Sequence, residues 1–444
     1  AGFAPHVPPG ADRIRRILCD EGYRAVFVGG CVRDTLLGLP AADWDIGTSA
    51  RPEDCMRIFL HHGIEVIPTG LRHGTVTVLW DGAGYEVTTF REDAGYSDGR
   101  RPDAVLFTDS LEQDLARRDF TINAIAWDPA SGLIDPFDGQ ADLKSGRIRT
   151  VGDPSLRFSE DALRMMRAVR FVGRLGFSID SATFAAIRAH ANTLVRVSAE
   201  RISSEWVQTA ASPHPEALFL YHETGLLSWF LPELEALYAL STGSGQSIGE
   251  HCIRVALLTP PTMVLRIAGL LHDIARTPDP GPGPDLHAAL SAESADRILR
   301  RLRFSVRDRE RIVWLIATHD DPVPATPADA RRLLAAAGPD RWEDWFALVA
   351  ADWMANHPNA PKSGLAGLER AAGWVRNSIE SGDPIGIQHL AVDGTDVVRA
   401  GFEGRAVGRV LHKCLDLVLE NPSANSRENL MRAMKSMSEE DHHD

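Results

Sequence analysis

The spacing of hydrophobic and polar positions divides the chain into a mixed α/β part and a longer helical part. After a proline-rich start, residues 12–21 have helical periodicity. The apolar run Arg24–Val28 ends in a Gly-Gly pair, which predicts a strand, a tight turn and a helix beginning near Val32. Further strands are predicted at Trp44–Gly47, Thr75–Trp80 and Tyr85–Phe90, the last two joined by an Asp81-Gly82 turn. These elements predict an α/β head.

Helical periodicity dominates from about Arg157 onward. Its first strong member is SEDALRMMRAVRFVGRLG at 159–176, and almost no strand-like alternation follows. A Gly/Pro-rich stretch at 277–285 predicts a loop inside this part. We therefore predict a head at 12–150, an all-α neck at 151–245, a helical body at 246–356 and a helical tail at 357–444.

The charge of the chain bears on its partners. The 444 residues carry a net charge of −14, so a polyanionic partner would need local basic patches. The sequence offers two such patches: Lys144, Arg147, Arg149, Arg157, Arg164, Arg167, Arg170 and Arg174, and then Arg297, Arg300, Arg301, Arg303, Arg307, Arg309 and Arg311. The second patch alone fits a solvated helix face equally well.

Cysteine usage and the absence of long apolar runs predict the compartment. The five cysteines are scattered and never spaced as C-x-x-C, which argues against a disulfide framework or a zinc ribbon. The first residues lack the features of a signal peptide, and no apolar run approaches the ~20 residues that a membrane helix needs. We predict a cytoplasmic protein without a membrane partner; the sequence does not predict its oligomeric state.

The segment after the first strand has the features of a phosphate site. Gly29 and Gly30 carry no side chains, so a triphosphate can approach the backbone N–H groups, and the following helix start favours negative charge. Arg33 is expected to add charge-assisted contacts. This segment is a candidate nucleotide site.

Paired carboxylates follow the glycines. Asp43 and Asp45 are two residues apart, so on a strand both point to one face and can share hard cations. Glu86, on a neighbouring predicted strand, is the candidate third carboxylate. Two Mg²⁺ ions held here would activate a hydroxyl and stabilise charge on an α-phosphate. A D-x-D pair alone is more often a solvated turn, but the glycines at this spacing favour catalysis.

These residues resemble a known family. GGCVRD followed by DWD is similar to the signature of class II tRNA nucleotidyltransferases, which include CCA-adding enzymes and bacterial poly(A) polymerases. RRDFTINAIA resembles their second motif, which implies that Arg118 and Asp119 contact the ribose and phosphates of the nucleotide. EDALR at 160–164 resembles their base-reading motif, and LAVDGTDVV at 390–398 resembles bacterial members. The resemblance implies a polymerase-beta-like head.

The base-reading segment also has a chemical explanation. Asp161 and Arg164 are expected on one face of a helix, where a carboxylate that only accepts and a guanidinium that only donates match cytosine and adenine. Uracil and guanine would leave both partners unsatisfied. Arg167 is the candidate for the triphosphate and Arg170 for RNA phosphate. The alternative is an ordinary salt bridge between Asp161 and Arg164 on a solvated face.

The segment Arg91–Asp103 is glycine-rich and charged, and we expect a surface loop there. In the resemblance it takes the place of the flexible loop needed to add the final A. Its presence favours CCA or A addition over CC addition.

Histidines and aspartates recur in the body. They are His251, His272-Asp273, His287, His319-Asp320 and Asp352, an order that resembles the HD phosphohydrolase domain. Imidazole and carboxylate together suit a divalent transition metal or Mg²⁺. We predict His251, His272, Asp273 and Asp352 as ligands. His287 and His319 are left as ligands of a second ion or of phosphate, with ordinary helix-bundle histidines as the alternative.

The resemblance implies template-independent addition of CMP and AMP to the 3′ end of tRNA from CTP and ATP. An A-adding enzyme or a poly(A) polymerase shares every motif, although the acidic C-terminus argues against the polymerase. An alternative from another class of enzyme is an HD phosphohydrolase that acts on RNA 3′ phosphates or cyclic phosphates. The intact Asp43–Asp45 pair argues against that as the main activity.

Overall fold

The computed structural model describes residues 5–41, 43–94, 104–241, 245–277 and 286–441. Contacts divide the chain into two compact units, the first formed by 1–236 with 301–303 and the second by 237–300 with 304–444. The division at 236/237 falls inside the predicted neck. The finer division into head, neck, body and tail remains a prediction.

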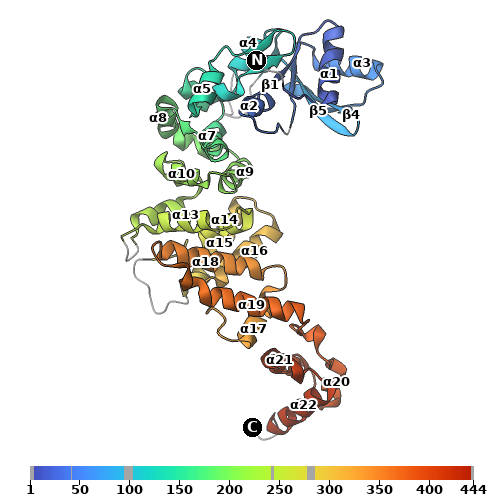
Figure 1. Ribbon diagram of the computed structural model, residues 1–444, viewed down its shortest axis with the longest axis vertical. Helices are drawn as coiled ribbons and strands as arrows, with labels where there is room; N and C mark the ends of the chain where they lie inside the picture. The colour runs from blue at the N-terminus through green and yellow to red at the C-terminus, as the bar shows by residue number, and fades with distance from the viewer. Residues whose placement is uncertain (1–4, 42, 95–103, 242–244, 278–285, 442–444) are drawn as a thin grey trace. The chain divides into compact units, whose positions relative to one another are not determined.

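The first unit is built on a seven-stranded mixed sheet, near the N-terminus in Figure 1. Its strands, in the order β3-β4-β5-β2-β1-β8-β9, are β3 (Val66–Gly70), β4 (Thr75–Trp80), β5 (Ala83–Thr89), β2 (Ile46–Thr48), β1 (Ala25–Val28), β8 (Ala126–Asp128) and β9 (Gly132–Ile134). β2 and β5 are parallel, whereas the other neighbours are antiparallel. The predicted mixed α/β head is confirmed.

Two shorter pairings complete the strands of this unit. β6 (Arg91–Ala94) pairs with β7 (Ala104–Phe107), and β10 (Arg147–Ile148) pairs with β11 (Ser178–Ile179). The start of the expected Arg91–Asp103 loop is therefore a strand. The rest of that prediction, at 95–103, lies outside the described residues.

Helices cover the sheet and form the remainder of the first unit. They are α1 (Pro9–Asp20), α2 (Gly30–Leu36), α3 (Pro52–His61), α4 (Leu111–Ala116), α5 (Gly139–Ser145), α6 (Pro154–Glu160), α7 (Leu163–Leu175), α8 (Ser181–His190), α9 (Ala199–Ala210), α10 (Phe219–Glu223), α11 (Leu227–Phe230) and α12 (Pro232–Ala236). α1 contacts β1, α3 contacts β4, and α7 packs against α9. α1 begins earlier than predicted because Pro9 occupies its first turn, where no N–H partner is needed.

Helices are the main regular elements among the described residues of the second unit. Its helices are α13 (Ile248–Leu258), α14 (Met263–Leu271), α15 (Leu286–Arg301), α16 (Val306–Thr318), α17 (Pro327–Ala337), α18 (Trp342–Asn356), α19 (Ala366–Glu380), α20 (Gly394–Arg399), α21 (Arg405–Glu420) and α22 (Arg427–Asp441). α13 packs against α14 and α18, and α14 also contacts α16. No helix among the described residues combines the length and apolar character needed to cross a membrane.

Candidate active site of the head and a buried histidine-aspartate cluster

The three predicted carboxylates lie on one face of the sheet. β2 and β5 are parallel with Ile46 opposite Val87, so the preceding residues, Asp45 and Glu86, are neighbours. Asp43 shares the side of Asp45 because side chains alternate along an extended chain, and Trp44 between them is buried against the ring of Phe27. β2 begins at Ile46, later than predicted. The backbone N–H of Val28 nevertheless donates to the Asp45 carbonyl at 3.1 Å.

A cavity of about 640 Å³ opens beside these carboxylates. Its lining includes Asp43, Asp45 and Glu86 together with Thr77 and Tyr85. Burial, followed by the nearby charge of Glu86, raises the pKa of Asp45 to about 6. Such a site holds excess negative charge, and a divalent cation would relieve it.

Gly29 lies against Arg118, a residue of the RRDFTINAIA segment at 117–126. Its φ of +76° favours glycine, and a Cβ there would lie 2.7 Å from Nη1 of Arg118. Arg118 also donates to Asp114 at 3.3 Å, and its charge favours the ionised form of Asp45. The predicted nucleotide residues Gly29 and Arg118 therefore lie together beside the carboxylates. The next glycine, Gly30, begins α2 with negative φ, and no such close contact constrains it.

Arg33 occupies a different environment from the one expected. Its guanidinium is buried, donates to Asp34 at 2.8 Å and to Asn123 at 2.5 Å, and lies over the ring of Phe171. Arg33 thus has protein partners in this structure, and its predicted phosphate contact remains a prediction.

Asp119 is the centre of a buried polar network. It accepts from both Nε and Nη2 of Arg167, at 2.8 and 2.6 Å, and from the side chain of Asn123 at 2.9 Å. Although burial opposes ionisation, Arg167 and Asn123 hold the pKa of Asp119 well below its usual range. Two predicted nucleotide residues, Asp119 and Arg167, are brought together by this network.

The predicted helical pairing of Asp161 with Arg164 is wrong. α6 ends at Glu160, and Asp161 is extended with φ −144° because its carboxylate accepts from Leu163 N–H at the start of α7. Asp161 pairs with both terminal nitrogens of Arg201, at 2.7 and 3.3 Å. Arg164 pairs instead with Glu160 at 2.5 Å and donates to the carbonyl of Arg117 at 2.9 Å. The two side chains thus have separate partners at a junction of helices.

A contact with RNA would require Arg170 to lie at the surface, but its side chain is largely buried. Its side chain is 11% exposed, donates from Nε to buried Glu205 at 2.5 Å, and lies 4.4 Å from the centre of the Phe171 ring. This position supports a packing role in the neck, and the expected contact with RNA phosphate has no support from it.

The predicted metal ligands of the body come together in the second unit. His251 on α13 lies 3.0 Å from Asp352 on α18, measured from Nε2 to Oδ1. His272 and Asp273 directly follow α14, and His272 Nε2 lies 3.6 Å from both Asp273 Oδ2 and Asp352 Oδ1. All but Asp352 are almost fully buried. The structure thus assembles the predicted ligand set from α13, the end of α14, and α18.

The orientation of His272 suits a metal ligand. Its Nδ1 lies 2.8 Å from the carbonyl of Gly269, which can only accept, so Nδ1 carries the proton and Nε2 faces the carboxylates. Nε2 of His251, Nε2 of His272 and Oδ1 of Asp273 are buried without a well-aligned hydrogen bond. Although burial disfavours the charged form, Asp273 and Asp352 raise the pKa of His272 to about 9. Buried imidazole and carboxylate atoms that face one another without well-aligned hydrogen bonds fit a cation.

Sequence reasoning missed several residues that hold these sites. Asn123 joins Asp119 to Arg33, and its place in the second motif was the only local signal. Arg201 and Glu205 reach the site from α9 with no sequence signal of their own. Oδ2 of Asp320 lies 2.9 Å from Nε2 of His287. His287 and His319 were named as candidate ligands, but Asp320 was not.

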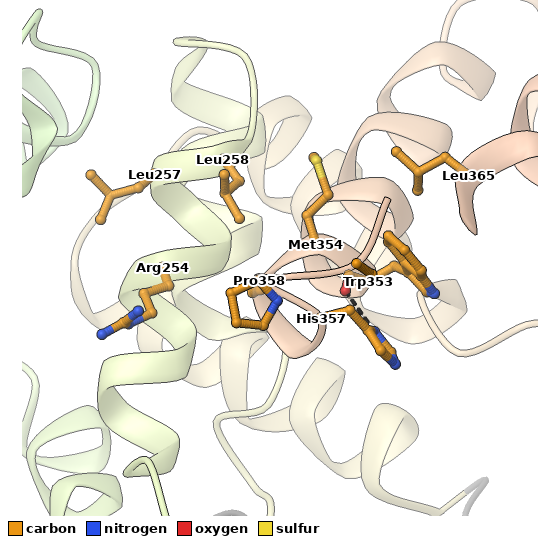
Figure 2. A pocket seen from close by; sticks show the side chains of 10 residues that line it. Arg254, Leu257, Leu258, Trp353, Met354, His357, Pro358 and Leu365 are labelled. Carbon is orange, nitrogen blue, oxygen red and sulfur yellow. Dashed lines mark hydrogen bonds between the residues drawn. The ribbon is translucent and has the colours of Figure 1, made fainter. Parts of the chain in front are cut away.

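A second pocket lies apart from both sets of residues. Figure 2 shows Arg254, Leu257 and Leu258 of α13 across from Trp353 and Met354 of α18. Its volume is about 450 Å³ and its lining is mainly apolar. None of the predicted site residues lines it, so we assign it no part in the chemistry of either site.

Comparisons with known proteins agree with these features. Residues 25–149 match the family described as the poly A polymerase head domain, 176–238 the probable RNA and SrmB-binding site of polymerase A, and 248–343 the HD domain. The CCA-adding enzyme of Geobacillus thermodenitrificans (strain NG80-2) is 54% identical over 222 residues, which cover 50% of this chain and 54% of that protein. The CCA-adding enzyme of Lactiplantibacillus plantarum is 44% identical over 259 residues, which cover 54% of this chain and 63% of that protein. The chain thus spans little more than half the length of the curated relatives it matches.

A solved structure extends the likeness over both chains. The Bacillus stearothermophilus CCA-adding enzyme in complex with CTP is 31% identical, with a TM-score of 0.74, over 98% of this chain and 99% of that one. A Thermotoga maritima CCA-adding enzyme, 18% identical with a TM-score of 0.63, shares the fold. With 31% identity over nearly the full length of both chains and all three family descriptions in order, this chain belongs to the CCA-adding enzyme family.

Proposed function

We propose that the chain adds CMP and AMP to the 3′ end of tRNA, using CTP and ATP without a nucleic-acid template. The observation that carries the proposal is the set of three carboxylates on one sheet face, beside Gly29 and Arg118. The names of the relatives and the CTP complex of the 31% identical enzyme support the same substrates. We place the reaction in the cytoplasm, where the five free cysteines suit a reducing environment.

The head residues divide the work of binding and chemistry. Gly29 leaves room for the triphosphate next to the backbone, and Arg118 brings positive charge to the same point. Arg167, which is one-third exposed beside Asp119, would meet the triphosphate from α7. Together these groups orient the α-phosphate for attack by the RNA 3′-hydroxyl, with pyrophosphate as the leaving group.

Asp43, Asp45 and Glu86 would hold two Mg²⁺ ions. The residues fit, since hard cations prefer carboxylates, and burial together with the neighbouring charge of Glu86 raises the pKa of Asp45. Bound there, the ions would lower the pKa of the 3′-hydroxyl and neutralise charge on the phosphates.

Asp161 and Arg164 are proposed to read the base. In this structure Arg201 and Glu160 hold the two side chains in separate ion pairs. A cytosine or adenine that replaces part of these contacts would receive one acceptor and one donor, whereas uracil or guanine would leave both groups unpaired. Base choice would then rest on protein side chains.

Replacement of Asp43 by alanine tests the proposal. We expect nucleotide addition to fall by at least about 10³-fold, since loss of cation binding removes several kcal/mol of transition-state stabilisation. Binding of tRNA, measured by filter binding, should change little. Glu65→Gln, at an exposed position of the head, is the matched control. Addition at the normal rate by Asp43→Ala would refute the two-metal assignment.

The His251–His272–Asp273–Asp352 cluster supports a second candidate activity. The observation that favours it is the set of imidazole and carboxylate ligand atoms that face one another, three of them buried without a well-aligned hydrogen bond. A divalent cation held there suits hydrolysis of phosphate monoesters or cyclic phosphates, which would restore a 3′-hydroxyl at damaged RNA ends. Release of inorganic phosphate from an RNA 3′-phosphate, lost in His251→Gln, is the test. Unchanged release in that variant would exclude the cluster.

A further inference from the structure

The sheet of the first unit carries hydroxyl side chains beside the three carboxylates. Thr77 on β4 lies directly opposite Glu86 on β5 in the antiparallel register, so the two side chains point to the same face. Thr77 also lines the cavity shared by Asp43, Asp45 and Glu86. Its hydroxyl lies 3.0 Å from the hydroxyl of Thr69 on β3. The polar face therefore continues from the carboxylates onto a threonine pair to which the proposed function gives no role.

The threonine pair keeps hydrogen-bonding capacity for a ligand. Each hydroxyl has one donor and two acceptor positions, and the contact between Thr69 and Thr77 occupies only one of each. Thr69 is exposed and Thr77 is half-buried, so a ligand in the cavity can reach the pair. The remaining donor and acceptor positions match a group that both donates and accepts, as a hydroxyl does.

The neighbouring position on β5 leaves the sheet face bare. Gly84 is two residues before Glu86 and also lines the cavity, so a side chain there would stand on the same face. A Cβ at Gly84 would lie 3.1 Å from Cγ2 of Thr77. The φ of Gly84 is negative, so the backbone conformation does not call for glycine. The glycine instead leaves room over β5 for a sugar ring.

The order of the strands determines the side from which RNA reaches the carboxylates. Gly29 follows β1 and, with Arg118, is the proposed site of the triphosphate. In the sheet, β1 is on one side of β2, whereas β5 and β4 are on the other. In phosphoryl transfer the attacking and leaving oxygens lie roughly in line across the phosphorus. With the triphosphate on the β1 side, the attacking 3′-hydroxyl comes from the side of β5 and β4, where Glu86 and Thr77 lie.

We infer that Thr77 binds the 2′-hydroxyl of the terminal nucleotide of the RNA and so holds its ribose beside the carboxylates. This inference rests on the proposed nucleotide addition and names the part of the RNA that this face of the sheet takes. The 2′-hydroxyl is adjacent to the attacking 3′-hydroxyl, and Thr77 is adjacent to Glu86, with Cβ atoms about 5 Å apart. A phosphate at this position would be repelled by the carboxylates, whereas a hydroxyl is not. The contact distinguishes an RNA end from a DNA end.

Two tRNA transcripts that end after CC test the inference, one with a terminal ribose and one with a terminal 2′-deoxyribose. Addition of AMP gives kcat/KM for each. We expect the wild-type chain to prefer the ribose transcript by about 5–10-fold, the effect of one hydrogen bond. Thr77→Val should lose this preference by slowing addition to the ribose transcript alone. Any effect of the sugar on the reactivity of the 3′-hydroxyl is the same for both proteins, so the change in preference reports the contact.

Thr75→Val is the matched control. Thr75 lies two residues earlier on the same face of β4, but its hydroxyl pairs with that of Thr88 at 3.1 Å, and it is not among the described residues that line the cavity. This variant should keep the wild-type preference for ribose. Valine retains the β-branched shape that suits a strand, so both variants should fold, which circular dichroism checks.

Gly84→Val tests the place of the RNA by a second route. The added side chain fills the space over β5, so the KM for tRNA should rise several-fold. The KM for ATP should change little, because the triphosphate lies on the other side of β2. An unchanged KM for tRNA, or a rise in the KM for ATP alone, would contradict the inferred place of the ribose.

The outcomes separate this inference from the function on which it rests. Normal addition of AMP by a wild-type chain that uses both transcripts equally well would overturn the inference and leave the proposed function. Retention of the ribose preference by Thr77→Val would do the same, since another group would then contact the 2′-hydroxyl. No addition to either transcript by the wild-type chain would refute the proposed function and the inference together.

Discussion

At the scale of single residues, the head depends on a buried ion pair whose strength varies with pH. Asp119 is 9% exposed and Arg167 33% exposed, and two hydrogen bonds join them. Arg167 and Asn123 hold the pKa of Asp119 below its usual value of about 3.9, so the pair stabilises the fold above that pH. The stabilisation is lost as the pH falls from that value toward the lower pKa of the folded state.

Asp119→Asn should show this dependence in urea unfolding. At pH 7 we expect a loss of about 2–3 kcal/mol in the free energy of unfolding, below the roughly 3–5 kcal/mol of fully buried pairs because Arg167 is partly solvated. The difference between wild type and variant should shrink as the pH falls from about 4 toward the lower pKa of folded Asp119. A difference that stays constant over this range would contradict the assigned charge state.

The proposed reading of the base also belongs to the scale of single residues. Arg164→Ala removes the proposed donor and should lower the preference for CTP over UTP by about 10–100-fold, the equivalent of roughly 1–3 kcal/mol for an unpaired polar group. Single-nucleotide incorporation with each triphosphate measures the preference. Arg188→Ala, on the exposed face of α8, is the control. An unchanged preference in Arg164→Ala would remove this residue from base reading.

At the scale of elements, the turn between β1 and α2 requires a backbone conformation that favours glycine, and substitution of Gly29 tests this requirement. Gly29 and Gly22 both have positive φ, +76° and +88°, but only Gly29 would place a Cβ against Arg118. Gly22→Ala should therefore report the backbone strain alone, of order 1–2 kcal/mol. Gly29→Ala should lose more stability and also lose nucleotide addition, because Arg118 must move. Equal effects on both measurements would contradict the role of this contact.

Much of the element pattern followed from local sequence. β4 has the predicted bounds, Thr75–Trp80, because its six residues alternate between faces, and the Asp81-Gly82 turn that follows has positive φ at both residues. β8 and β9 were not predicted, since strands of three residues are too short to show a period. The break at Asp161 was missed because helical periodicity continues across it. Only the capping contact with Leu163 reveals it.

Site residues, like strands and helices, could be predicted only where a local sequence pattern marks them. Asp43, Asp45 and the His272-Asp273 pair were found because their chemistry is encoded in short spacings. Asn123, Arg201 and Glu205 depend on contacts with residues that are distant along the chain or carry no spacing signal. Arg33 and Arg170 were expected at phosphates, because a sequence does not distinguish an arginine that meets a buried carboxylate from one that meets a ligand.

At the scale of the whole molecule, the two proposed chemistries lie in separate compact units. The carboxylates of the head belong to the first unit, whereas the histidine-aspartate cluster belongs to the second. We therefore expect Asp43→Ala to abolish nucleotide addition and leave release of phosphate from an RNA 3′-phosphate intact, and His251→Gln to have the reverse effect. Loss of both activities in either variant, with the fold intact, would contradict this division.

The central claim is addition of CMP and AMP to tRNA, and the most direct measurement supplies the chain and Mg²⁺ with three tRNA transcripts. These end before CCA, after C and after CC, and each is incubated with CTP, ATP or both. We predict that all three are completed to CCA with no further growth. A single A added only to the transcript ending in CC would instead indicate an A-adding enzyme, and long A tails a poly(A) polymerase; either result would contradict the claim.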